Sequence, residues 1–451
     1  MSQLSAETAN DLDILSDLVA KAKKAGADAA DAVMFESASL EVSYRLGKRE
    51  DLERSESKDL GLRVFKGQKQ AIVSSTDMTT SSLDELLERG LAMATAMPED
   101  PYCGLADPDR LCKDIPDLDL YDAIEPTPEA LYEMAAEAET AALAVAGVSN
   151  SESAGAGWGS NRIALITSTG FAGGYATSSH SLFASVIAGE GTGMERDYDF
   201  TSAHHGGDLS AAAGVGTSAG ERAVRRLNPS KVESQQVPVV FDPRVSNSML
   251  GHFVGGINGA AVARGTSFLK DRLGKNVFAP GITIVDEPHR KRGLGSKPFD
   301  GEGVVNKKWL LADKGELATW IMDSASARQL GLATTGHASR GTSGPPSPST
   351  TNLYMQPGTC SRDELLADIP SGLYITELIG FGVNGVTGDY SRGASGFWIE
   401  NGVLAHPVSE LTIAGNLKDM FLEMTPADDL IFRYGSNAPT LRIDGLMVAG
   451  T

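Results

Sequence analysis

One histidine within a helix-like segment is the first residue whose type and position could support chemistry. His252 lies in "SNSMLGHFVGGINGAAVARGTSF", residues 246–268, and we expect a helix over residues 243–263. A zincin-type helix carries two histidines on one face and a glutamate that polarises the metal-bound water. Here Gly256 stands four residues after His252, and Phe253 follows His252 directly. The spacing therefore favours a structural histidine over a metal ligand.

A serine between glycines is a second candidate. "GTSAG", with Ser218 at its centre, matches the G-x-S-x-G pattern of a nucleophile elbow. Such an elbow needs a strand before it and a helix after it, whereas the residues on both sides of this segment have a helical composition. We expect a helix over residues 209–227 in which the small residues serve packing.

A glycine-rich segment suggests a nucleotide site. "GFGVNG", residues 380–385, follows the apolar run "LYITELI", and Glu400 lies near the spacing of a ribose-binding acid. The following "VTGDYSRGASGFW" has no helical period, although a dinucleotide site needs a helix N-terminus for the pyrophosphate. The segment predicts tight turns between strands.

The cysteines leave one further nucleophile open. Cys103, Cys112 and Cys360 are odd in number, and we expect free thiols. Cys360 precedes "SRDELL", where Ser361 and Glu364 form a capping-box pattern, so Cys360 stands beside a helix N-terminus. An independent hydrolase that uses Ser218 or Cys360 is thus one functional hypothesis.

Composition limits the class of protein. The 451 residues carry 59 acidic and 39 basic side chains, a formal charge of −20, which disfavours direct binding to nucleic acid. The N-terminal "MSQLSAETANDLD" lacks the features of a signal peptide, and no run approaches the length of a membrane span. We expect a globular, cytoplasmic protein of two or three domains with no membrane contact.

The order of the expected elements predicts an α+β fold. Residues 1–115 read as an α/β sandwich-like domain whose first helix carries Leu12, Leu15, Leu18, Val19 and Ala22. A loop rich in proline and aspartate separates it from a middle α+β segment, residues 116–232. Residues 233–451 contain the His252 helix and then short β-like runs, which predicts a mainly β C-terminal domain.

Five segments of the C-terminal half identify the chain by resemblance. They are "MLGHFVGGINGAAVARGTSFLKDRLGK", "GLGSKPFDGEGV", "TTNLYMQPG", "ELIGFGVNGVTGDYSRGASGFWIENG" and "GNLKDM". In content and order they resemble the TldD/PmbA family, the metallopeptidase-like proteins also described as modulators of DNA gyrase, and within it the PmbA (TldE) branch. The resemblance extends over essentially the whole chain and implies a metallopeptidase-like C-terminal domain.

The resemblance also implies a degenerate zinc site. The TldD branch carries H-E-x-x-x-H on this helix and a cysteine near the C-terminus, and the corresponding positions here are Gly251, His252, Gly256 and Tyr434. We therefore expect no catalytic or metal-binding residues and no cofactor in this chain. The zinc would belong to a TldD-like subunit that pairs with this one as a heterodimer and cleaves unfolded peptides.

A second hypothesis assigns a different class of function. In the absence of such a subunit, the chain would be a metal-free homodimer that binds peptides or a regulatory protein, as the gyrase-modulator description suggests. Its acidic composition allows protein partners.

Overall fold

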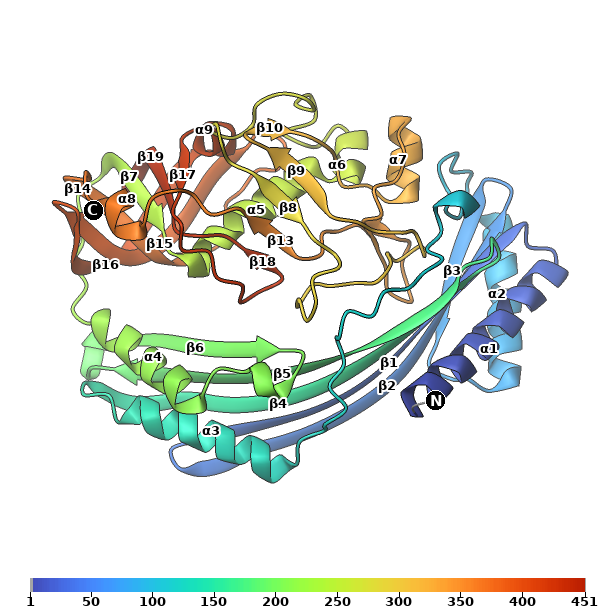
Figure 1. The fold of residues 1–451 in the computed structure, drawn as a ribbon, viewed down its shortest axis with the longest axis horizontal. Helices are drawn as coiled ribbons and strands as arrows, with labels where there is room; N and C mark the ends of the chain where they lie inside the picture. Colours follow the sequence, from blue (N-terminus) through green and yellow to red (C-terminus); the bar gives the residue numbers. More distant parts are fainter. Residues whose placement is uncertain (1–2, 451) are drawn as a thin grey trace.

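A six-stranded antiparallel sheet unites the first half of the protein. The computed structural model describes residues 3–450. Strand β1 of the N-terminal segment pairs with β4 of the middle segment from Asp31↔Thr167 to Tyr44↔Ala154, so the two segments share one sheet (Figure 1). Its strands, in the order β3-β2-β1-β4-β5-β6, are β1 (Ala29–Arg45), β2 (Lys48–Lys66), β3 (Lys69–Ser75), β4 (Val148–Thr167), β5 (Ala172–Ala188) and β6 (Glu195–Ala203).

Two pairs of helices cover one face of this sheet. The alternation of Leu60, Leu62 and Val64 on β2 turns these side chains toward the first pair, α1 (Gln3–Lys24) and α2 (Thr80–Ala96). The second pair, α3 (Pro128–Leu143) and α4 (Ala212–Arg225), covers the other end of the same face. The predicted apolar stripe of the first helix is confirmed, since its buried residues include Leu15, Leu18, Val19 and Ala22.

The C-terminal half packs on the opposite face of the sheet. Its main sheet has the strand order β16-β15-β14-β7-β19-β17, and β16 also pairs with β19, so five of its strands close into a barrel. The strands are β7 (Gln235–Phe241), β14 (Ser371–Ile379), β15 (Asp389–Glu400), β16 (Val403–Asn416), β17 (Met424–Pro426) and β19 (Leu441–Ala449). The α+β fold with a mainly β C-terminal half is confirmed.

Short elements complete this half. A five-stranded sheet has the order β10-β9-β8-β13-β18, with β8 (Ile284–Asp286), β9 (Trp309–Asp313), β10 (Glu316–Leu317), β13 (Leu353–Met355) and β18 (Ser436–Asn437). The hairpin β11 (Ala338–Ser339) and β12 (Ser347–Pro348) lies apart from it, and the short helices are α7 (Ser324–Leu330), α8 (Arg362–Leu366) and α9 (Leu417–Leu422). Among residues 3–450, no helix has the length and apolar character needed to span a membrane.

The predicted helix over residues 243–263 is divided in two. Helix α5 (Pro243–Ile257) ends at Asn258, whose ψ of 116° is extended, and α6 (Gly259–Ala263) follows. The Asn258 side chain accepts hydrogen bonds from the backbone N–H groups of Ala260 and Ala261, which caps the new helix. An asparagine that satisfies its own backbone neighbours competes with helix continuation, and this explains the break.

A buried ionic cluster holds the two halves together. Asp31 of β1 has no exposed surface and forms ion pairs with Arg63 of β2 and, at 2.7 Å, with Arg340 of the C-terminal half. Close by, a Cβ atom on Gly61 would lie 2.3 Å from the carbonyl oxygen of Thr342. The absence of a side chain at Gly61 therefore permits the close approach that the ion pairs require.

We expect Asp31→Asn to lower the free energy of unfolding by about 3–5 kcal/mol, because it leaves two buried guanidinium groups with one countercharge removed. Urea denaturation of wild type and variant measures this. The matched control is Asp84→Asn, which removes the exposed pair with Lys21 and should cost less than about 1 kcal/mol. Equal effects of the two substitutions would contradict the proposed role of Asp31.

Candidate functional site

Helix α5 is fixed at both its start and its buried face. Asp242, at the end of β7, accepts a hydrogen bond of 2.9 Å from the backbone N–H of Arg244, and Pro243 occupies the first helical position. The helix buries Met249, Leu250, Phe253 and Ile257 in the core of the C-terminal half. This packing sets which side of α5 faces outward.

His252 lies at the edge of that buried face. Its ring meets the ring of Tyr390 edge-on, with centroids 5.7 Å apart. Within the described part of the chain, His252 Nε2, the Tyr390 hydroxyl and Arg392 Nε are buried and have no hydrogen-bond partner. Burial, together with the charge of Arg392, lowers the pKa of His252 to about 4. The imidazole is therefore neutral at physiological pH.

The glycines of α5 occupy two different environments. A Cβ atom at Gly251 or Gly255 would meet no atom within 4 Å, so this side of the helix is open. A Cβ atom at Gly256 would lie 2.9 Å from side-chain atoms of both Phe268 and Leu269. Of the two degenerate histidine positions, only Gly251 has room for a larger side chain.

Tyr434 belongs to a segment that runs along α5. Asn247 Nδ2 donates to the carbonyl oxygen of Ser436 at 3.5 Å, so the segment lies beside the first half of the helix. The Tyr434 ring packs against Phe200 of β6, with centroids 5.6 Å apart, and burial raises the pKa of its hydroxyl. The Tyr434 side chain thus contacts the first sheet, whereas His252 contacts Tyr390 of β15.

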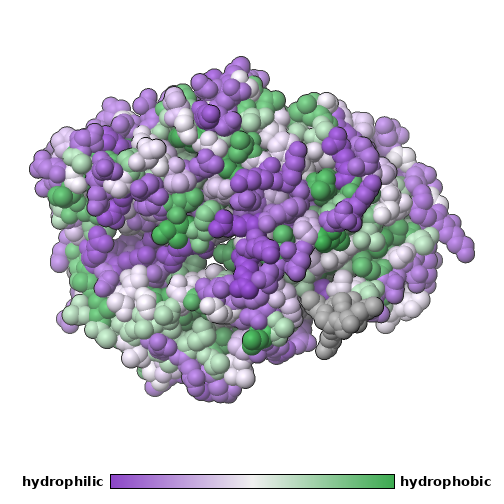
Figure 2. All heavy atoms as spheres, viewed as in Figure 1, coloured by the Kyte–Doolittle hydropathy of each residue, from purple (hydrophilic) through white to green (hydrophobic). Residues whose placement is uncertain are grey.

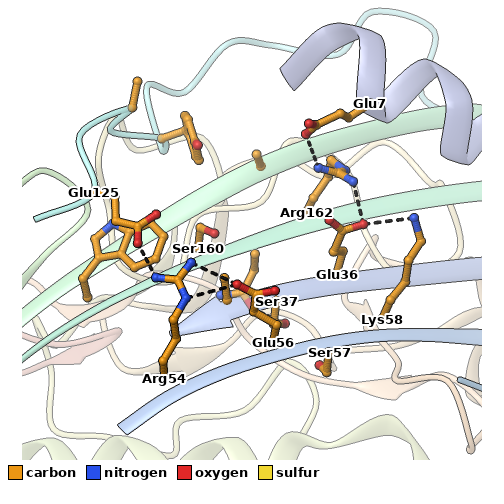
Figure 3. A pocket seen from close by; sticks show the side chains of 16 residues that line it. Glu7, Glu36, Ser37, Arg54, Glu56, Ser57, Lys58, Glu125, Ser160 and Arg162 are labelled. Carbon is orange, nitrogen blue, oxygen red and sulfur yellow. Dashed lines mark hydrogen bonds and ion pairs between the residues drawn. The ribbon is translucent and has the colours of Figure 1, made fainter. Parts of the chain in front are cut away.

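A polar cavity of about 900 Å³ lies on the helix-covered face of the first sheet (Figure 3). Arg162 bridges Glu7 and Glu36, and Lys58 also pairs with Glu36. Arg54 forms a second group with Glu56 and Glu125. Because the cationic side chains of this cavity pair with its own carboxylates, it presents little unbalanced charge to a ligand.

The environment of Ser218 is that of a packed helix. A Cβ atom on Gly216 would lie 1.9 Å from the carbonyl oxygen of Ala138, so the small residues of "GTSAG" allow α4 to approach α3. Ser218 hydrogen-bonds to Asp199, whose pKa is lowered by that bond and by Arg222 and Arg433, although burial opposes this. A carboxylate with a lowered pKa is a poor general base, and the packing interpretation of this motif is confirmed.

Cys360 lies directly before the N-cap residue of helix α8. Its Sγ atom lies 3.8 Å from the carbonyl oxygen of Pro426. The predicted capping box is confirmed, because Ser361 Oγ accepts from the N–H of Glu364 and the Glu364 carboxylate accepts from the N–H of Ser361. The use of Cys360 as a nucleophile stays a hypothesis.

The "GFGVNG" segment connects β14 to β15, and a strand rather than a helix follows it. The predicted turns are confirmed, and the geometry lacks the helix that a dinucleotide needs. Phe381 at the tip of this connection is 98% exposed.

Sequence reasoning missed a group of arginines where β6, α4 and α5 meet. Six of them line two adjoining cavities: Arg222, Arg225, Arg226, Arg244, Arg362 and Arg433. The signal in the sequence was "RAVRR", which places Arg222, Arg225 and Arg226 at helical i, i+3 and i+4 spacing. The remaining three come from distant segments and could not be grouped from spacing.

Comparisons with known proteins cover most of the chain. Models described as PmbA/TldA metallopeptidase domain 1, central domain and C-terminal domain match residues 30–94, 121–227 and 234–450. The chain belongs to the PmbA/TldD family. It is 37% identical over 427 residues to Metalloprotease PmbA of Escherichia coli O157:H7, covering 94% of this chain and 92% of that protein.

Further family members show the same extent of similarity. The Metalloprotease PmbA homolog of Haemophilus influenzae is 38% identical over 434 residues, covering 95% of this chain and 94% of that protein. A Bacteroides thetaiotaomicron protein described as a candidate modulator of DNA gyrase superposes with a TM-score of 0.89 at 28% identity, covering 97% and 98% of the two chains. TldE of Thermococcus kodakarensis, at 19% identity and a TM-score of 0.86, covers 97% and 100% and shows the same fold.

The lowered pKa of His252 predicts a pH dependence of stability. Between about pH 6.5 and pH 4 the unfolded chain takes up a proton at this residue while the native imidazole stays neutral. Stability from this residue is therefore fully present above about pH 6.5 and is lost as the pH falls toward 4, by on the order of 2 kcal/mol. His252→Gln should lack this component in urea denaturation across the window, and His406→Gln, at a half-buried histidine of β16, should retain it. Identical pH profiles for His252→Gln and wild type would contradict the assignment.

The two environments of the α5 glycines predict opposite substitution effects. Gly251→Ala should stabilise the protein by about 0.5–1 kcal/mol, because it adds helix propensity without a clash. Gly256→Ala should destabilise it by about 1–3 kcal/mol, because the new methyl group meets Phe268 and Leu269. Thermal unfolding measures both, and effects of the same sign would show that the outward face of α5 is misassigned.

Proposed function

We propose that this chain is the PmbA/TldE-type, non-catalytic subunit of a cytoplasmic heterodimeric TldD/TldE zinc metallopeptidase that cleaves unfolded peptides. The zinc is held by a TldD-like partner. The observation that carries the proposal is the environment of the three α5 positions that correspond to the H-E-x-x-x-H motif.

Each of these positions is unsuited to its catalytic role. Gly251 is open but carries no ligand, and Gly256 is backed by Phe268 and Leu269 at a distance that leaves no space for an imidazole. His252 stands where the TldD branch has its glutamate base, and its Nε2 is buried beside Tyr390. A general base must reach the water that it deprotonates, so this histidine cannot replace that glutamate.

The comparisons support the family half of the proposal. The relatives named Metalloprotease PmbA align with more than nine tenths of the chain. Within a heterodimer, the contribution of this chain would be to hold the partner in its active conformation and to line the path of the peptide.

Co-expression with the TldD-like chain of the same organism tests the proposal. A tag on the present chain should recover both subunits with near-equimolar zinc and chelator-sensitive digestion of casein. The chain purified alone should contain no stoichiometric zinc and should not digest casein. Gly251→Ala in the complex should preserve turnover, since this position carries no ligand.

Two results would overturn this assignment. Near-equimolar zinc with chelator-sensitive activity in the isolated chain would make it catalytic. Recovery of a homodimer that binds peptides and does not associate with the TldD-like chain would favour the second hypothesis, a metal-free binding protein.

A further inference from the structure

A cavity with two tryptophans in its walls lies where the segment between α2 and α3 meets the C-terminal half. We call it the tryptophan cavity, because Trp309 of β9 and Trp320 line it together with Arg110 and Lys307. Its volume is about 420 Å³. Sites for small ligands typically measure roughly 300–1,000 Å³, so the tryptophan cavity has the size of a ligand site.

The walls of this cavity are mainly apolar, and several of them remain in contact with solvent. Leu273, Val305 and Leu332 line the cavity and are 44%, 53% and 47% exposed. Figure 2 shows one face of the molecule, on which hydrophobic patches are separated by hydrophilic residues. Exposed apolar side chains that gather around a single cavity indicate a surface that an apolar group can cover.

Two exposed cationic side chains line the same cavity. Arg110 ends the short helical turn Pro108–Arg110, and its carbonyl oxygen accepts a hydrogen bond of 3.0 Å from the backbone N–H of Val305. Lys307 follows Val305 by two residues, and its Nζ atom lies 4.4 Å from the centroid of the Trp309 ring. The backbone contact between the two segments thus brings both cations to the apolar walls.

No carboxylate of the described chain neutralises these two cations. Among residues 3–450, neither Arg110 nor Lys307 forms an ion pair, and the lining of the cavity contains no acidic residue. In the polar cavity of Figure 3, by contrast, Arg54 and Arg162 are paired with glutamates. The tryptophan cavity therefore keeps two positive charges in a chain whose net charge is −20, and it favours an anionic ligand.

An unused hydrogen-bond donor belongs to the same lining. Trp320 is 4% exposed, and its indole N–H has no hydrogen-bond partner within the described part of the chain. The indole N–H of Trp309, in contrast, donates to the carbonyl oxygen of Thr335 at 2.9 Å. Because buried indole N–H groups usually find a partner, the Trp320 donor is suited to an oxygen atom of a ligand.

We propose that the tryptophan cavity binds an apolar carboxylate, a ligand in which a carboxylate group is joined to a hydrophobic chain or side chain. The hydrophobic part would lie against the two tryptophans, and the carboxylate would accept hydrogen bonds from Arg110 and Lys307. A free aliphatic acid and the C-terminal residue of a peptide share this chemistry. The site goes beyond the proposed function, and only the peptide source would connect the two.

Isothermal titration calorimetry of the full chain tests the proposal without a partner subunit or zinc. Octanoate should bind, more weakly as salt is raised. Octanol lacks the carboxylate and acetate lacks the apolar chain, so each should bind about tenfold or more weakly than octanoate. Acetyl-Gly-Ser-Leu with a free C-terminus, and its C-terminal amide, form the peptide arm. Tighter binding of octanoate than of the free peptide identifies a free acid as the source, and the reverse order identifies a peptide C-terminus.

Substitutions locate the site. Arg110→Gln together with Lys307→Gln should weaken binding of the preferred acid about tenfold or more and leave octanol unaffected, because only the contacts to the carboxylate are lost. Val305→Asp, at an exposed wall residue, should also weaken it, since it places a negative charge beside the ligand. The matched control is Lys48→Gln together with Lys291→Gln, which removes two exposed lysines outside the cavity and should leave the affinity unchanged. Circular dichroism checks that all variants are folded.

Fluorescence gives a second measure of location. Octanoate with a bromine atom at the end of its chain should quench tryptophan fluorescence on binding, because Trp309 and Trp320 line the cavity. The same ligand should not quench the fluorescence of folded Val305→Asp at equal concentration.

Several results would overturn the proposal. These are equal affinity for octanoate and octanol, no binding of octanoate or of the free peptide, binding without quenching, or a loss in the control double variant that matches the loss in the cavity variant. Failure of zinc peptidase assembly with intact binding of the apolar acid would refute the proposed function alone. Assembly with no binding of either acid would refute the ligand site alone.

Discussion

The buried contact between Asp31, Arg63 and Arg340 is the interaction on which the arrangement of the whole protein depends. Although burial alone raises the pKa of Asp31, the charges of Arg340 and Arg63 leave it below its usual value. The carboxylate is thus ionised between two cations, one from its own sheet and one from the C-terminal half. Separation of the halves would remove Arg340 from this cluster. Loss of one member of a buried ion cluster is costly, because it leaves a charge without its partner.

Neighbouring acids show how closely this region is packed. Burial, with a contribution from Glu302, raises the pKa of Asp300 to about 8, and burial also raises the pKa of Glu302. Two Asp300 oxygens accept backbone N–H groups from Glu302, Val304 and Ala338. The loops of the C-terminal half are therefore shaped by side chains that satisfy backbone groups, in a stretch with little regular secondary structure.

This fixed arrangement explains the surfaces between the halves. Once the sheet and the barrel are held together at Asp31, the arginines of α4, α5 and α8 line the same two cavities. Asp197 and Asp199 pair with three of them, Arg222, Arg226 and Arg244, and Asp199 also pairs with Arg433. The lining of these cavities thus comes from both halves of the protein.

The helix α5 links this architecture to the family. The helix is open at Gly251 and is packed against Phe268 and Leu269 at Gly256, and its histidine is neutral, with a buried Nε2 atom. A chain with this helix retains the fold of its family, and at Gly256 the helix packs closely against Phe268 and Leu269.

The sequence by itself determined the local elements and the family. Helical periodicity predicted α1 and α4, and the capping box predicted the start of α8. The lack of a helical period after "GFGVNG" argued against a dinucleotide site. All of these features depend on residues that are neighbours in the sequence. Only the tertiary structure decided that β1 pairs with β4, that α5 stops at Asn258, and that Arg244, Arg362 and Arg433 join the arginines of α4. Pairings between distant strands and charge clusters from separate segments depend on long-range packing, which leaves no periodic signal in the chain.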